Sequence, residues 1–269
     1  MAKSRRLVYS IIIIFIIAIT ILVIQSNVVE TKETNNGVDL LFGKNFISYV
    51  IEEGKSMDFN LLGVQDLKTN KTSIEKIIEN IKFNNPNVEI LDYQLSIGNQ
   101  YQHYQLFNII FTVKVLTENV ESAEKLTVQF KDGSEEVYDF GHLSIVTDSN
   151  YHKEHLEPYA EYNVGYPQLE LNVNIRSTSQ EDVQLLKINN LAEEISYSFN
   201  KPLVLSHQDV KRIKIDNFNI NELENYDFIT LTPILSYSIN GQNYQYNMPG
   251  VVYGMFSADE ELIQKIIKQ

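Results

Sequence analysis

The chain has 269 residues, no cysteine and no tryptophan, and a formal net charge of −13 at pH 7. The absence of cysteine excludes a disulfide-held scaffold and thiolate metal sites, so a packed core must stabilise the folded part. An acidic balance without a basic stripe argues against nucleic acid as a partner.

The clearest feature of the sequence is an apolar run near the N-terminus. Leu7 to Ile24 carries no charge and follows three basic residues. As a helix this run would reach about 27 Å, close to the hydrocarbon thickness of a bilayer. We therefore predict a transmembrane anchor over residues 7–25 and, by the positive-inside tendency, a cytoplasmic tail over residues 1–6. The rest of the chain is then extracytoplasmic, and the expected location is the cell membrane.

A cleaved signal peptide is the alternative interpretation of the same run, because it would also begin with basic residues. Cleavage requires small residues just before the cut. Ala18 and Thr20 would suit it, but the apolar run continues to the bulky Ile24, two positions before Ser26. We favour the retained anchor. Whether the segment is ever cleaved stays open at this stage.

The part after the anchor is strongly acidic. It holds all 35 acidic residues and 19 of the 22 basic ones, which leaves it with a net charge of −16. Such a surface repels phosphate backbones and anionic headgroups, and it also maintains solubility. With about 240 residues, this part can bury the core of one large domain or two ordinary ones.

The outer part divides at changes in composition. Residues 26–55 are expected to be a juxtamembrane spacer, although the apolar stretch Phe46–Glu52 indicates a short strand or helix that docks on the fold. Residues 56–148 are predicted to form a first strand-rich domain, residues 149–167 a linker, and residues 168–269 a second α+β domain. The expected fold class is α+β and strand-rich: one transmembrane helix, then antiparallel sheets with a few amphipathic helices.

In the first domain the pattern changes from helix to strand. Thr72 and Glu75 have the spacing of a capping box, and four isoleucines follow at helical spacing until Pro86. Alternating stretches then predict antiparallel strands that turn at Gly98-Asn99 and at Asp132-Gly133. The strands are expected over 90–97, 101–116, 126–130, 137–140 and 142–147.

In the second half, Gln168–Arg176 has the cleanest strand pattern of the chain. Ser179–Phe199 fits two structures: a helix, with Ser179 as its cap and apolar residues at three-four spacing, or a strand, with alternation only at its end. We favour the helix to about Tyr197. Further strands are expected around 212–218, 228–239, 244–247 and 251–256, and an amphipathic helix over Ala258–Ile267.

No enzyme motif is present: the sequence contains no nucleophile elbow, P-loop, dinucleotide fingerprint or zinc-protease helix. We therefore predict no catalytic residue, no cofactor and no enzymatic activity. A carboxylate pair of the glycosidase kind could still be hidden among the many acidic residues. Four residues of the linker region are weak candidates for a metal site, for which loop solubility is the simpler explanation: Asp148, His152, His155 and Glu157.

The 16 tyrosines are the compositional anomaly. Several lie near predicted hairpins beside Gln and Asn, where amphipathic rings suit a protein interface or a sugar face, although half-buried sheet positions are their ordinary use. This group contains Tyr101, Tyr104, Tyr237, Tyr244, Tyr246 and Tyr253. The candidate binding residues are Tyr101, Tyr104, Tyr244 and Tyr246.

Two functional classes follow. The favoured hypothesis is a single-pass anchored, non-enzymatic protein of the cell envelope whose outer part binds another envelope protein as an accessory or sensor subunit, with the membrane contacted through Leu7 to Ile24. The alternative is a cell-wall glycan-binding protein or hydrolase that uses the tyrosine-rich hairpins as its platform. Exposed, coplanar tyrosines beside paired carboxylates would favour the second hypothesis, and buried tyrosines would remove its support.

Overall fold

A computed structural model describes residues 38–148, 155–220, 225–255 and 257–269. Residues Asp39 to Gln269 form one compact unit. The predicted anchor, Leu7 to Ile24, lies outside the described residues. Within the described ranges, no helix has the length and apolar character that a membrane span needs.

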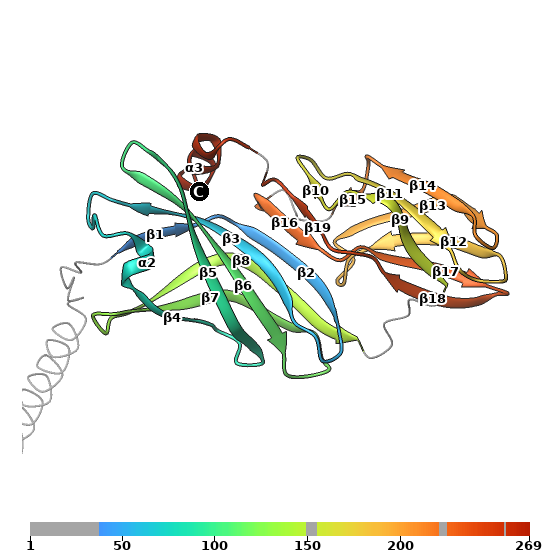
Figure 1. The fold of residues 1–269 in the computed structure, drawn as a ribbon, viewed down its shortest axis with the longest axis horizontal. Coiled ribbons are helices and arrows are strands. Elements are labelled where there is room, and N and C mark those ends of the chain that lie inside the picture. The colour runs from blue at the N-terminus through green and yellow to red at the C-terminus, as the bar shows by residue number, and fades with distance from the viewer. Residues whose placement is uncertain (1–37, 149–154, 221–224, 256) are drawn as a thin grey trace, which may run out of the picture. The chain divides into compact units, whose positions relative to one another are not determined.

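Strands dominate this unit, and the described residues form four sheets in which most neighbours are antiparallel (Figure 1). A strand-rich fold with mostly antiparallel sheets is thus confirmed. The four-stranded sheet has the order β1 (Asp39–Phe42), β3 (Met57–Asp66), β6 (Tyr104–Val115), β5 (Val88–Tyr101). The seven-stranded sheet has the order β10 (Gly165–Tyr166), β19 (Val251–Tyr253), β16 (Phe228–Leu231), β2 (Asn45–Glu52), β8 (Glu135–Asp148), β7 (Glu121–Phe130), β4 (Ile78–Phe83).

The other two sheets come from the second half of the chain. The three-stranded sheet has the order β14 (Val210–Ile215), β11 (Leu171–Ser177), β9 (Leu156–Tyr162). The five-stranded sheet has the order β15 (Asn219–Ile220), β13 (Ile195–Leu205), β12 (Val183–Asn189), β17 (Ile234–Ile239), β18 (Gln242–Asn247). The described residues contain two helices, α2 (Ile74–Ile77) and α3 (Asp259–Ile267).

Aromatic side chains pack the four-stranded sheet onto the seven-stranded sheet. Phe59 and Phe111 face each other on β3 and β6, with ring centroids 5.7 Å apart. From the other layer, Phe83 on β4 lies 5.4 Å from Phe111 and 5.5 Å from Phe140 on β8. Aromatic pairs at such distances add about 0.5–1.5 kcal/mol to the effect of burial. These contacts hold the first sandwich together.

The second sandwich has an aliphatic core between the three-stranded and five-stranded sheets. On β11, Leu171, Val173 and Ile175 are buried and alternate with half-buried polar residues, as the sequence predicted for a strand here. They pack in one cluster with side chains of the facing sheet, which include Val183 and Leu185. Burial of one such side chain contributes about 1.5–3 kcal/mol, so this core is the main source of stability in the second half.

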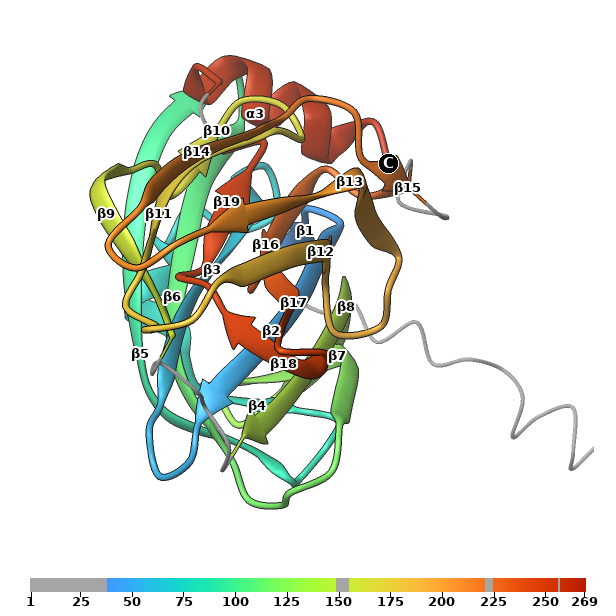
Figure 2. The same ribbon diagram turned by 90° about the vertical axis from the view of Figure 1, so that its right-hand side faces the viewer.

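The C-terminal segment returns to the first sandwich. β16 pairs in parallel with β2, and α3 packs against β3, β5 and β6 (Figure 2). The buried face of α3 consists of Leu262, Ile263 and Ile266, and its first turn carries acidic residues that favour the positive end of the helix dipole. The tip of the β5–β6 hairpin is bound as well, because Asn99 donates two hydrogen bonds to Asp259. The predicted closing helix is therefore confirmed.

Two predicted helices are wrong. In the first, only α2 is helical, Thr72 and Glu75 form no capping box, and the chain continues as strand β4 from Ile78. In the second, Ser179–Tyr197, the described chain forms β12 and the start of β13. In both places a β-bulge, between Ile78 and Asn80 on β4 and between Leu185 and Lys187 on β12, interrupts the two-residue alternation.

The predicted division into domains stays a prediction, but several boundaries now have a structural description. Residues 39–52 of the expected spacer form β1 and β2, and β2 lies inside the seven-stranded sheet. Residues 156–162 and 165–166 of the expected linker form β9 and β10, while residues 149–154 lie outside the description. Strands from both halves of the chain contribute to the seven-stranded sheet.

Candidate functional site

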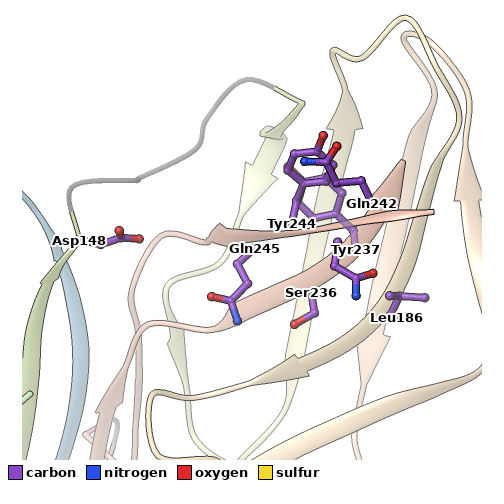
Figure 3. A pocket seen from close by; sticks show the side chains of 8 residues that line it. Asp148, Leu186, Ser236, Tyr237, Gln242, Tyr244 and Gln245 are labelled. Carbon is purple, nitrogen blue, oxygen red and sulfur yellow. The ribbon is translucent and has the colours of Figure 1, made fainter. Parts of the chain in front are cut away.

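A pocket of about 650 Å³ borders strand β18 (Figure 3). Three strands of the five-stranded sheet and the end of β8 supply its walls. The lining residues are Asp148, Leu186, Ser236, Tyr237, Gln242, Asn243, Tyr244 and Gln245. Most of these side chains end in amide or hydroxyl groups, so the pocket offers both hydrogen-bond donors and acceptors.

A tight turn determines which residues meet in the pocket. Asn240 and Gly241 both have positive φ, 50° and 80°, as a two-residue type I′ hairpin requires. The predicted Asn-Gly turn is thus confirmed. The turn connects β17 to β18, and it places Tyr237 opposite Tyr244 and Ser236 opposite Gln245.

The pocket reaches both faces of β18. Successive side chains of a strand point to opposite faces, yet four consecutive residues, 242–245, line the pocket. In Figure 3, Tyr237 and Tyr244 lie on one side of the hairpin, and Ser236 and Gln245 lie on the other. Since β18 is the last strand of its sheet, the pocket extends to a sheet edge.

An aromatic cluster supports one side of this edge. The rings of Tyr237 and Tyr244 are stacked, with centroids 5.5 Å apart, and the ring of His155 meets Tyr244 edge-on at 4.9 Å. The His155 Nδ1 atom lies 2.9 Å from the Tyr237 hydroxyl oxygen, within hydrogen-bond distance. Tyr237 is fully buried, whereas Tyr244 is half-buried. Tyr244 is thus held by a rigid neighbour and keeps part of its ring accessible.

The opposite end of the pocket carries its carboxylate, Asp148. The side-chain amide of Asn247 donates a hydrogen bond to Asp148, with an Nδ2–Oδ2 distance of 3.0 Å. Among the lining residues that the structure describes, Asp148 has the only carboxyl group, and none of them is a Lys, Arg or His.

The metal candidates do not converge in the described part of the chain. Glu157 accepts a hydrogen bond from Arg176, with an Nε–Oε1 distance of 2.6 Å, while His155 contacts the tyrosines and Asp148 accepts from Asn247. His152 lies outside the described residues. Within the residues described, no group of three or more His, Asp or Glu has a geometry that could hold a metal ion.

The four candidate tyrosines lie at two distant places. Tyr101 and Tyr104 pair across the β5–β6 hairpin and pack, half-buried, in the cluster beneath α3. Tyr244 lines the pocket, whereas its neighbour Tyr246 is buried in the core of the second sandwich. Of these four tyrosines, only Tyr244 is part of the pocket.

Sequence reasoning missed most of the remaining lining residues. The Asn-Gly turn contained the needed signal, because two-residue hairpins pair residues symmetrically about the turn. That symmetry places Gln245 opposite Ser236. Leu186 and Asp148 gave no such signal, since they come from β12 and β8, far away in the sequence.

No protein-family model matches the sequence, and no curated protein matches it. Among solved structures, the chain is similar to a chimeric titin Z1Z2 functionalized with a KLER exogenous peptide from decorin, with 9% identity over 80% of this chain and 96% of that one and a TM-score of 0.21. It is also similar to a protein of unknown function from Porphyromonas gingivalis W83, with 12% identity over 80% and 98% of the two chains and a TM-score of 0.23. A third is domains 5-6 of the S-layer protein SbsC, with 8% identity over 79% and 97% and a TM-score of 0.21. Similarity at this level adds nothing about the role of this chain.

Proposed function

We propose that the chain is a single-pass, membrane-anchored module of the cell envelope whose extracytoplasmic part binds another envelope protein without catalysing a reaction. The apolar run Leu7 to Ile24, with basic residues before it, supports the anchor and its orientation. An accessory or sensor role of this kind requires a partner protein.

The pocket around β18 is the observation that carries the binding role. It combines a rigid, partly accessible aromatic ring, Tyr244, with neutral amide and hydroxyl groups from Ser236, Asn243 and Gln245. Tyrosine and adaptable polar groups of this kind are typical of protein-binding surfaces. At the other end of the pocket, Asp148 accepts a hydrogen bond from the side-chain amide of Asn247, which fixes the position of this carboxylate.

The glycan hypothesis has lost its support. It depended on six tyrosines that would form an exposed platform. Three of them, Tyr237, Tyr246 and Tyr253, are buried, and the other three are half-buried and lie at two separate places. They do not form the open, coplanar surface that stacking against sugar rings needs.

Site-specific photocrosslinking in membranes of the native host tests the proposal. A photoreactive amino acid replaces Gln245 in the pocket, and a matched control carries it at Val137, which is 62% exposed on β8. A version with an unrelated transmembrane anchor is tested in parallel. We expect one discrete protein adduct from position 245 with either anchor and none from position 137. Identical adduct patterns at both positions, or no adduct at position 245, would reject the pocket as a protein-binding site.

A further inference from the structure

Each of the four sheets ends in two edge strands, and exposed edges invite pairing with other chains. Proteins usually block an edge by making the strand very short, by placing charges or proline on it, or by a β-bulge. Among the described edge strands of this chain, all but one carry at least one of these features.

Seven of the edge strands carry at least one blocking feature. Three are short: β1 has four residues, and β10 and β15 have two each. β5, β4 and β9 contain register shifts together with charged residues, and β9 also contains Pro158. β14 carries three basic residues in six positions: Lys211, Arg212 and Lys214.

β18 is the exception. Its sequence, QNYQYN, contains no charged residue and no proline, and its pairing with β17 runs over six residues without a register shift. Gln242, Asn243 and Gln245 are exposed. The pocket of about 650 Å³ borders this same strand, so there is space beside the edge for further groups.

The hairpin geometry indicates which backbone groups face outward. In a two-residue hairpin the residues next to the turn, here Ile239 and Gln242, exchange both hydrogen bonds, and such pairs then recur at every second position. Tyr244 therefore directs its N–H and C=O groups towards β17. Asn243 and Gln245 direct theirs away from the sheet, along an edge to which no described strand is paired.

We propose that an extended segment of the partner protein adds to the five-stranded sheet as a new strand beside β18. This inference rests on the proposed function and specifies how the pocket binds. Main-chain hydrogen bonds from Asn243 and Gln245 supply affinity in this mode, and the pocket walls select alternate side chains of the segment. One face of the added strand meets Tyr244, and the other meets Ser236 and Gln245.

Charge defines the chemistry of the occupant. β18 itself is neutral, Asp148 stands at one end of the pocket, and the part of the chain after the anchor has a net charge of −16. A segment that carries Asp or Glu would be repelled, whereas a neutral or basic one would be attracted. The occupant is therefore an extended segment without acidic residues, and not a second copy of this acidic chain.

The test uses the full-length chain in detergent micelles and a displayed library of random twelve-residue peptides as the probe. Three variants distinguish strand addition from recognition by side chains alone. Gln245→Pro removes an outward N–H without touching the ladder to β17, Gln245→Ala removes only the side chain, and Gln245→Lys adds a blocking charge. Circular dichroism confirms that each variant is folded.

We expect selected peptides without Asp or Glu whose binding falls at least tenfold in Gln245→Pro and in Gln245→Lys but less than threefold in Gln245→Ala. Methylation of alternate backbone nitrogens in such a peptide should abolish binding in the same way. Equal losses in the Pro and Ala variants would mean side-chain recognition, which overturns strand addition but leaves the protein-binding role intact. The inference would be overturned if the selected peptides were acidic or if no peptide were selected. It would also be overturned if the chain formed dimers that Gln245→Pro dissociates.

Discussion

The side-chain amide of Asn190 donates a hydrogen bond to the hydroxyl of Ser48, with an Nδ2–Oγ distance of 3.0 Å, across 142 residues of sequence. Asn190 lies just after β12 and is fully buried, and its Oδ1 atom accepts a bond from the Ile195 backbone N–H at 2.9 Å. The Leu191 N–H also donates to the Ser48 hydroxyl. The β12–β13 connection of the five-stranded sheet is thus bonded to the middle of β2 in the seven-stranded sheet.

Asn190→Ala should lower the free energy of unfolding by about 1–3 kcal/mol, because it removes the buried hydrogen bond to Ser48 and leaves the buried Ile195 N–H without its acceptor. Urea denaturation followed by tyrosine fluorescence measures the change. The matched control is Asn119→Ala at an exposed position, which should stay within about 0.5 kcal/mol of the wild type. An equal effect of both substitutions would show that the buried bond to Ser48 contributes no stability.

Gly141→Ala should destabilise the protein by more than about 2 kcal/mol, because the added methyl group would clash with the backbone of the neighbouring strand. Gly141 has a φ of +109°, and an added Cβ would lie 2.1 Å from the backbone oxygen of Asn45 on the neighbouring strand β2. Gly133 provides the control: its φ is +88°, but the space around it is open. Gly133→Ala should therefore cost only the backbone strain, about 1–2 kcal/mol. Similar denaturation midpoints for the two variants would refute the predicted clash.

The two wrong helices show where sequence patterns mislead. On β12, Val183 and Leu185 are buried at the spacing of a strand, but the bulge shifts the next buried residue to Ile188, three positions on. On β4 the bulge likewise separates the buried Ile78 and Ile81 by three positions. A strand with a bulge therefore imitates helical spacing, and only the pairing with neighbouring strands distinguishes the two structures.

The site was predictable to a smaller extent than the fold. Tyr244 followed from composition and from its place beside an Asn-Gly turn, whereas Tyr101 and Tyr104 had the same local signature but lie beneath α3. The difference depends on which hairpin the C-terminal helix covers, and that contact joins segments distant in the sequence. Local patterns do not contain it.

Glu121 should make stability depend on pH in the acidic range. Hydrogen bonds from Thr117, at 2.6 Å, and from Asn85 and Asn87 hold the pKa of this carboxyl below its ordinary value. A lowered folded-state pKa gives stability that is complete above the unfolded value of about 4.3 and is lost as the pH falls through the folded pKa. Glu121→Gln should therefore be less stable than the wild type at pH 7, and the difference should shrink towards pH 3.

Urea midpoints measured from pH 7 to pH 3 check this prediction. The control is Glu135→Gln, because Glu135 begins β8 at an exposed position. Its curve should run parallel to that of the wild type over the whole range. A Glu121→Gln curve that also stays parallel would mean that the hydrogen bonds from Thr117, Asn85 and Asn87 do not favour the ionised carboxyl.

The predicted membrane topology can be tested directly because the chain has no cysteine, so that a single introduced thiol reports its own location. Val137→Cys places the thiol on an exposed position of β8, and Ser4→Cys places it in the predicted tail. With a membrane-impermeant maleimide, intact cells should label the Val137→Cys variant only. The Ser4→Cys variant should react after permeabilisation, because basic residues before an apolar run stay cytoplasmic. A Ser4→Cys variant that never reacts, together with a mature mass that lacks the first 25 or so residues, would identify Leu7 to Ile24 as a cleaved signal peptide and remove the anchor from the proposed function.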